Sequence, residues 1–153
     1  MLHFAYGSNM HGGVMRRHAP NAVPIGVAQL PNYRFVITAD GYASIVPAAG
    51  QWVYGVIWRL TLRDRATLDA WENIAAGLYR AEILPVRANG RRQSTLVYIA
   101  RQRPFGRPKP SYMEIVVKAA REWKLPADYI ASLEEWLPKR VLGAGHRKLG
   151  EIG

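Results

Sequence analysis

Strand-like segments fill most of the first hundred residues of this chain, and one long helical segment interrupts them. Runs of aromatic and β-branched residues predict strands at 2–6, 22–41, 42–48, 51–60, 78–88 and 92–102. A short helix ends before Pro20, and longer helices are predicted at 61–75, 110–124 and 127–137. Because strands and helices do not alternate regularly, the order argues against a doubly wound parallel sheet. It favours an α+β architecture whose sheet curls into a barrel.

Local signals mark the ends of several elements. Thr61-x-x-Asp64 is typical of a capped helix start. Asn89-Gly90, between the last two strands, favours a tight hairpin because both residues tolerate positive φ. Pro126 separates the two final helices.

The first strand breaks into a turn after only a few residues. In "FAYGSNM" (4–10), Phe4 and Tyr6 alternate as in a strand, and Gly7-Ser8-Asn9 follows directly. Gly allows positive φ, and Ser and Asn hydrogen-bond to nearby backbone, so the chain turns sharply there. Such a turn leaves backbone N–H groups without partners, which predicts a binding turn rather than a plain connection.

Length and composition limit the class of protein. The 153 residues suit one domain, and 49% hydrophobic content can build a substantial core. We expect a domain at 1–138 and a basic, Gly-rich tail at 139–153. The chain has no Cys, which excludes disulfides, thiolate nucleophiles and Cys-ligated zinc. No apolar run is long enough for a membrane span and the N-terminus is too short and polar for a signal peptide, so we expect a cytoplasmic protein.

The positive charge raises the question of an anionic partner. The chain holds 21 Lys and Arg against 11 Asp and Glu, a net charge of +10. Much of the excess lies in the segments 101–110 and 139–153. These segments are interpreted either as a solvated loop and tail or as contacts to an anion such as nucleic acid.

Glu72 is the acid with no local structural explanation. On the helix at 61–75, Asp64 sits in the first turn and Asp69 follows Arg65 by four residues, within pairing distance. At 100° per residue, Glu72 shares the apolar face of Leu68, and the helix offers it no cation. A carboxyl buried in this way has a raised pKa, as a general acid/base near neutral pH requires. The alternative is that it reaches water, or an Arg of another strand such as Arg80.

The remaining nucleophile and ligand candidates are weaker. The four histidines, at 3, 11, 18 and 146, show no metal-ligand spacing and are interpreted as surface or capping residues. In particular, His3 is expected to point out of the first strand. Ser8 lacks a G-x-S-x-G elbow, so its turn is interpreted as a source of hydrogen-bond donors rather than of a nucleophile.

Four ordered blocks resemble the γ-glutamylcyclotransferase family, including its AIG2-like relatives. They are "FAYGSNM", "GYASIVPAAGQWVYGVIWRL", "ATLDAWE" with "AAGLYRAEILPV", and "KPSYMEIVVKAAREWKLPADYIASL". Together they run in order from Phe4 to about Leu133, which is most of the chain. The resemblance implies a small mixed β-barrel with surrounding helices and an enclosed cavity. It also implies release of an amine or amino acid from a γ-glutamyl compound as 5-oxoproline forms, with no metal or cofactor.

The resemblance also implies site residues. The acid/base of the family falls on Glu72. The substrate-binding positions fall on Tyr6, Gly7, Ser8, Asn9, Tyr79 and Tyr98, with Tyr112 as a weaker candidate. The expected partner is a small γ-glutamyl substrate.

Two departures from the family pattern stand out. Asn73 follows Glu72 where the family commonly has Gly, although Asn also tolerates the left-handed region. The basic segments 101–110 and 139–153 are not part of the pattern, and they leave the substrate open.

Several functions therefore remain open at this stage. The substrate can be a γ-glutamyl amino acid, a γ-glutamyl amine, glutathione or a biosynthetic intermediate. The glutathione-specific branch is disfavoured by Asn9, because a Y-G-S-L-type turn is expected there. Outside this enzyme class, the chain can be a nucleic-acid-binding barrel or a family member that binds a metabolite without turning it over.

Overall fold

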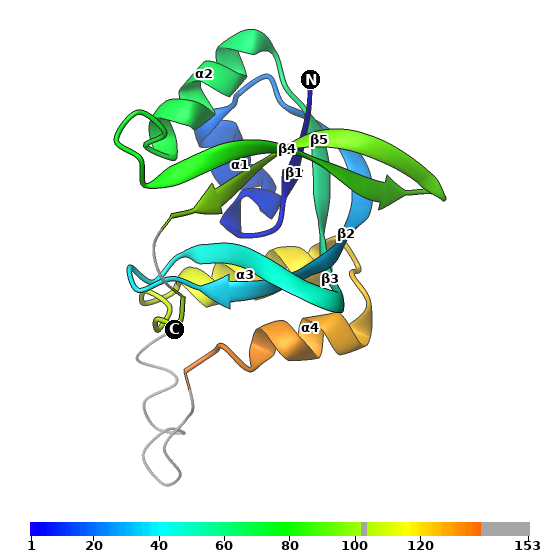
Figure 1. Cartoon of the computed structure of the whole chain (residues 1–153), viewed down its shortest axis with the longest axis vertical. Coiled ribbons are helices and arrows are strands. Elements are labelled where there is room, and N and C mark those ends of the chain that lie inside the picture. Colours follow the sequence, from blue (N-terminus) through cyan, green and yellow to red (C-terminus); the bar gives the residue numbers. More distant parts are fainter. Residues whose placement is uncertain (102–103, 139–153) are drawn as a thin grey trace, which may run out of the picture.

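The strands close into a barrel in the order β1-β3-β2-β4-β5, with helices around it (Figure 1). The structure is a computed structural model that describes residues 1–101 and 104–138. The strands are β1 (Leu2–Ala5), β2 (Val23–Ile37), β3 (Ala43–Arg59), β4 (Tyr79–Ala88) and β5 (Arg91–Ala100). The helices are α1 (Gly12–His18), α2 (Leu62–Trp71), α3 (Tyr112–Glu122) and α4 (Ala127–Glu134), and a 3-10 turn, η1, spans Ser8–Met10. The predicted α+β barrel is confirmed, whereas the predicted tail at 139–153 lies outside the described residues.

The short strand β1 makes the barrel mixed. It pairs antiparallel with β3 from Leu2 to Ala5, and parallel with β5 at His3 and Leu96. On the far side, β2 meets β4 at Gln29 and Arg87. With a neighbour on each side, β1 is held in place, so the turn that follows it starts from a fixed point.

The long hairpin of β2 and β3 differs from the prediction. The segments 42–48 and 51–60 were expected as two strands, but they form one continuous strand. The register slips between Pro31 and Tyr33 of β2, and three extra residues of β3 are accommodated there. Gly50 N–H donates to Asn32 Oδ1 over 3.1 Å, and both residues have positive φ. The predicted break is therefore a bulge inside one strand.

The other local signals behave as expected. Asn89 and Gly90 both have positive φ, at 52° and 73°, and join β4 to β5 as a tight hairpin. Thr61 Oγ1 accepts from Asp64 N–H over 3.0 Å at the start of α2.

Helices α3 and α4 lie beside the β2 and β3 hairpin, while α2 lies at the other end of the molecule (Figure 1). One face of α3 is buried and consists of Met113, Val116, Val117, Ala119 and Ala120. Just beyond α3, the indole Nε1 of Trp123 donates to the carbonyl of Met10 over 2.9 Å, which ties this helix to η1. No helix in the described ranges is long and apolar enough to cross a membrane.

Gly55 allows β1 to approach β3 closely. A Cβ at this position would lie 2.2 Å from the carbonyl oxygen of Ala5 and 2.9 Å from the ring of Phe4. Both Phe4 and Ala5 are buried in the core. Any side chain at position 55 therefore has to displace the backbone of β1 just before the turn.

We expect Gly55→Ala to lower the free energy of unfolding by at least about 2 kcal/mol, since overpacking that moves backbone is costly. Urea unfolding monitored by Trp fluorescence measures the change. Gly13→Ala on α1 is the control, because its added Cβ would meet only the imidazole of His11. Equal stability of Gly55→Ala and the unmodified protein would contradict the tight β1–β3 contact.

Candidate functional site

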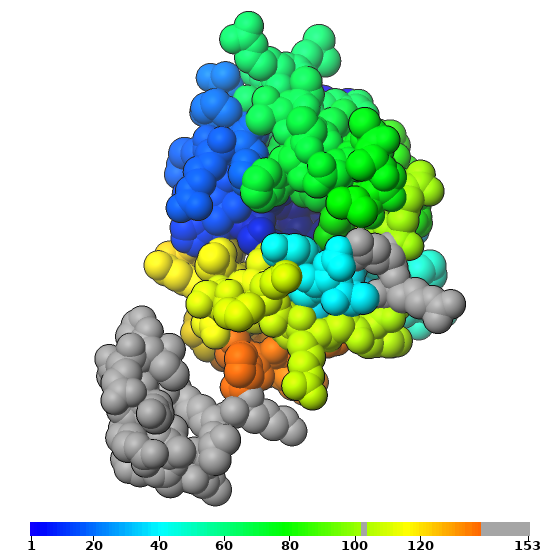
Figure 2. Space-filling view, turned by 90° about the vertical axis from the view of Figure 1, so that its left-hand side faces the viewer, coloured from blue at the N-terminus to red at the C-terminus, as the bar shows by residue number. Residues whose placement is uncertain are grey.

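A cavity of about 760 Å³ lies at the end of β1. Figure 2 shows its mouth between α1, the end of α2, the turn from β2 to β3 and the segment at the start of α3. The residues predicted from the sequence all line this cavity: Tyr6, Gly7, Ser8, Asn9, Glu72, Tyr79, Tyr98 and Tyr112. Residues from distant parts of the chain thus share one enclosed space, as a small-molecule site requires.

The turn after β1 supplies backbone donors to the cavity. The N–H groups of Met10 and His11 donate back to the carbonyls of Gly7 and Ser8, each over 3.0 Å. Within the described part of the chain, the N–H groups of Gly7 and Asn9 form no hydrogen bond. The Oδ1 atom of Asn9 is buried and likewise has no partner among these residues. Free N–H groups in such a turn form a concave site for an anion.

Gly7 is tightly enclosed on its outer side. A Cβ there would lie 3.0 Å from the Cβ of Ala43 and 3.0 Å from the hydroxyl oxygen of Tyr112. That hydroxyl oxygen accepts from Ala43 N–H over 3.2 Å. Hydrogen bonds from Ala43 and Ser8 hold down the pKa of Tyr112, although burial raises it overall. Tyr112, the weaker candidate from the sequence, therefore lines the cavity beside the turn and is hydrogen-bonded to Ala43.

Glu72 is placed by the way α2 ends. It is the C-cap residue, and Asn73 takes positive φ, at 53°. Asn73 N–H donates to Ala70 O and Ile74 N–H to Asp69 O, each over 3.1 Å. This is the Schellman arrangement, with Asn in place of the usual Gly. The helix stops earlier than the predicted 61–75, and its last turn turns the Glu72 side chain toward the cavity.

The Glu72 carboxyl is largely shielded from water and has no cation beside it. Among the described residues it forms no salt bridge or hydrogen bond, and Arg80, the suggested partner, pairs with Glu82 instead. Burial raises the pKa of the Glu72 carboxyl from 4.5 to about 7. The carboxyl is therefore partly protonated near neutral pH and can both accept and donate a proton.

Tyrosine hydroxyls surround this carboxyl, and each of three donates to a fixed acceptor. Tyr6 Oη donates to Tyr98 O over 2.6 Å, and Tyr79 Oη to Ala43 O over 3.1 Å. Tyr98 Oη donates to Asp69 Oδ1 over 2.6 Å. Burial, followed by the negative charge of Glu72, raises the pKa of Tyr79, so its proton stays on. Because each of these hydroxyls already donates its proton to a protein acceptor, it can only accept a hydrogen bond from a ligand.

One histidine, His3, differs from the prediction of surface or capping positions. His3 is only 2% exposed, lines the cavity, and has its Nδ1 2.9 Å from Leu96 O. Burial lowers the pKa of His3 to about 4, so the ring is neutral at pH 7. His18 also lines the cavity and stacks on Trp71. His11 caps α1 as predicted, by accepting from Gly13 N–H, and His146 lies outside the described residues.

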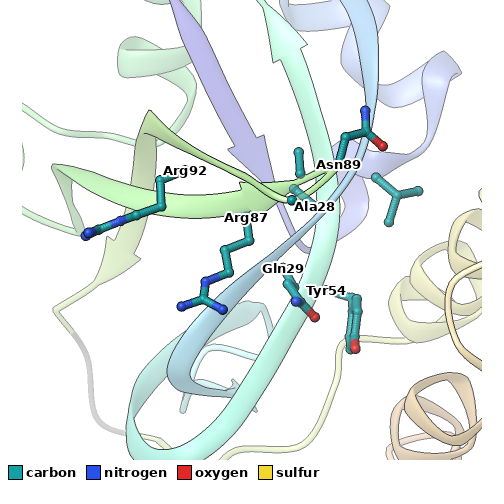
Figure 3. A pocket seen from close by; sticks show the side chains of 9 residues that line it. Ala28, Gln29, Tyr54, Arg87, Asn89 and Arg92 are labelled. Atoms are coloured by element: carbon teal, nitrogen blue, oxygen red, sulfur yellow. The ribbon is translucent and has the colours of Figure 1, made fainter.

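The outer wall of the barrel carries a second hollow, where β2 and β4 separate (Figure 3). Its charged residues are Arg87 and Arg92, which face each other across the β4–β5 hairpin. No acid among the described residues lines the hollow. It therefore offers no acid/base group, unlike the cavity that holds Glu72. In the portion of the chain that is described, no cluster of three His, Asp or Glu could hold a metal ion.

Comparisons with known proteins agree on one family. The profile of the AIG2-like family matches residues 52–133, which include Glu72 and both β4 and β5. A γ-glutamylcyclotransferase of Mus musculus is 28% identical over 93% of this chain and 81% of its own length. A γ-glutamylcyclotransferase of Homo sapiens is 25% identical over 99% of this chain and 86% of its own length.

A solved structure shares the whole fold. It is titled γ-glutamyl cyclotransferase and superposes with a TM-score of 0.85 at 24% identity. The superposition covers 99% of this chain and 96% of the solved one. The barrel and its surrounding helices are therefore those of this fold.

The raised pKa of Glu72 leads to a prediction about how the thermal stability depends on pH. Because the folded pKa of Glu72 is about 7 and its ordinary value is 4.5, the unfolded chain loses this proton at lower pH than the folded protein does. Ionisation of Glu72 therefore favours unfolding as pH rises from about 4.5 to 7. We expect Glu72→Gln to raise Tm at pH 8 and to change it little at pH 4.5, as measured by calorimetry. An equal shift at both pH values would show that burial does not perturb this carboxyl.

Proposed function

The chain belongs to the AIG2-like family of γ-glutamylcyclotransferase-type proteins, and on this premise we propose that it cyclises a γ-glutamyl amide. In this reaction the α-amine of the γ-glutamyl group attacks its own γ-carbonyl carbon. A five-membered ring closes, the amide C–N bond breaks, and 5-oxoproline and a free amine or amino acid are released. One observation carries the proposal: an unpaired Glu72, largely shielded from water, lies in the same cavity as the free amides of the turn after β1.

Glu72 provides the proton transfers in this proposal. A free α-amine has a pKa of about 8, so the substrate arrives mostly as an ammonium that cannot attack. Glu72 takes one proton from this nitrogen and later delivers a proton to the leaving nitrogen, which would otherwise depart as an amide anion. With a carboxyl pKa of about 7, removal of the proton is uphill by only about 1 kcal/mol. For an ordinary Glu the same transfer costs about 5 kcal/mol.

The turn and the tyrosines hold the substrate in a reactive shape. The N–H groups of Gly7 and Asn9 are suited to the substrate carboxylate or to the oxyanion that develops on the γ-carbonyl. In this proposal the hydroxyl oxygens of Tyr79 and Tyr98, which line the cavity, accept from substrate N–H groups. Because amine and carbonyl belong to one molecule, fixing the folded conformer can supply much of the roughly 7–11 kcal/mol associated with proximity. No metal or cofactor takes part in this scheme.

The direct test is release of 5-oxoproline from a panel of γ-glutamyl compounds. We expect Glu72→Gln to lower kcat by about 10² to 10⁴, because general acid/base catalysis is lost, while substrate binding by calorimetry stays within a few-fold. Glu82→Gln is the matched control, since Glu82 pairs with Arg80 and does not line the cavity. Turnover by pure Glu72→Gln at the normal rate would remove Glu72 from this role. If the unmodified protein releases no 5-oxoproline from any compound, the proposed function fails.

The turn makes a separate prediction about binding. Gly7→Ala places a methyl group against Ala43 and the Tyr112 hydroxyl, so the amides of the turn have to shift. A displacement of a fraction of an ångström in a positioned site is costly, and we expect KM to rise about tenfold or more. Steady-state kinetics on the best substrate of the panel measures this, with Gly13→Ala as the control. An unchanged KM would show that the substrate does not contact this turn.

A further inference from the structure

The cavity extends past Glu72 to an end built by α1 and α2. Arg17 and His18 line it from the last turn of α1, and Trp71 lines it from the last residue of α2. None of these residues belongs to the predicted site. They form a separate part of the wall, and one of them, Trp71, directly precedes Glu72 in the chain.

The rings of His18 and Trp71 stack on each other, and this contact joins the end of α1 to the end of α2. Their ring centroids lie 3.9 Å apart with an interplanar angle of 22°, which is a stacked arrangement. Trp71 is nevertheless 58% exposed, so much of the indole remains available. Burial, and next the charge of Arg17, lowers the pKa of His18, which favours the neutral ring.

Arg17 is the permanent cation of the cavity. No other Lys or Arg of the described ranges lines it. Arg17 is exposed and forms no salt bridge with the residues that the structure describes. It precedes His18 in the chain, and both residues line the cavity together with Trp71.

The candidate substrates differ in the charges they bring to the cavity. Every γ-glutamyl compound carries one carboxylate and one α-ammonium on its glutamyl half. A γ-glutamyl amino acid or peptide carries a second carboxylate, on the half that leaves, and a γ-glutamyl alkylamine does not. A carboxylate that enters a partly enclosed cavity needs hydrogen-bond donors or a cation, and Arg binds it with a paired, charge-assisted geometry.

We infer that Arg17, beside the His18–Trp71 stack, binds the carboxylate of the leaving amino acid. Arg17 is thus a specificity-determining residue, and the preferred substrates are γ-glutamyl amino acids or peptides rather than γ-glutamyl amines. The exposed face of Trp71 supports the hydrocarbon part of the same group. This inference rests on the proposed function, because it names the leaving group of that reaction.

Two substrates test the inference because they differ only by the carboxylate in question. Alanine is ethylamine with a carboxylate added, so γ-glutamyl-L-alanine and γ-glutamylethylamide are a matched pair. The measured quantity is the ratio of kcat/KM for the two, which reports discrimination alone. We expect the unmodified protein to prefer γ-glutamyl-alanine, and Arg17→Ala to reduce the ratio about tenfold, in the range of a charge-assisted hydrogen bond. Arg17→Lys should restore part of it.

Arg16→Ala is the control variant. Arg16 precedes Arg17 on the same exposed helix, but it does not line the cavity, and its guanidinium lies near Gly12. Both variants remove one surface charge, so general effects of net charge cancel between them. We expect Arg16→Ala to keep the ratio of the unmodified protein.

The outcomes separate the two claims. If both substrates yield 5-oxoproline and Arg17→Ala keeps the ratio of Arg16→Ala, the role of Arg17 is overturned while the proposed function stands. If the unmodified protein prefers γ-glutamylethylamide, the substrate class is overturned. If neither substrate is cyclised by any variant, although γ-glutamyl compounds of the wider panel are, the leaving-group assignment fails. If no compound is cyclised, the proposed function fails and the inference fails with it.

Discussion

Burial of the Glu72 carboxyl without a cation is the constraint on which the site depends. A buried carboxylate is normally paired, and Arg80, the partner the sequence offers, is instead paired with Glu82. Among the described residues the charge therefore has no partner in the cavity, and loss of hydration alone raises the cost of ionising this carboxyl. Because no cation among them offsets this loss of hydration, the pKa of the carboxyl rises to about 7, near that of an amine. An Arg paired directly with this carboxylate would lower its pKa and remove the proposed chemistry.

Two backbone turns hold the groups that define this cavity. At the end of α2, Asn73 adopts a left-handed conformation that ends the helix, and Glu72, just before it, lines the cavity. At the end of β1, Gly7 lies so close to Ala43 and Tyr112 that no side chain fits without movement. Both turns follow elements that are fixed by the barrel, so neither the carboxyl nor the amides depend on a free loop for their position. Rigid placement of this kind is what an intramolecular reaction needs.

The sequence predicted local features well and tertiary surroundings less well. Asn89-Gly90 and the inward Glu72 could be recognised because turn chemistry and helical periodicity are local properties. His3 was misplaced because alternation tells which residues share a face, whereas β1 is covered on both faces. The break expected in β3 is a bulge, since residues such as Gly50 can end a strand or interrupt one. The His18–Trp71 stack joins two helices that are far apart in the sequence, so no spacing along the chain predicts it.

Adjacency of Trp71 and Glu72 links recognition to chemistry. In the proposed reaction Glu72 delivers a proton to the leaving nitrogen, and in an amino acid that nitrogen is one carbon away from the carboxylate. A site for this carboxylate must therefore lie within a few bonds of the proton donor. Consecutive residues at the end of α2 satisfy this requirement, because their side chains leave the helix about 100° apart. Trp71 stacks on His18 of α1, and Glu72 lines the same cavity, so a leaving group seated against Trp71 is presented to Glu72.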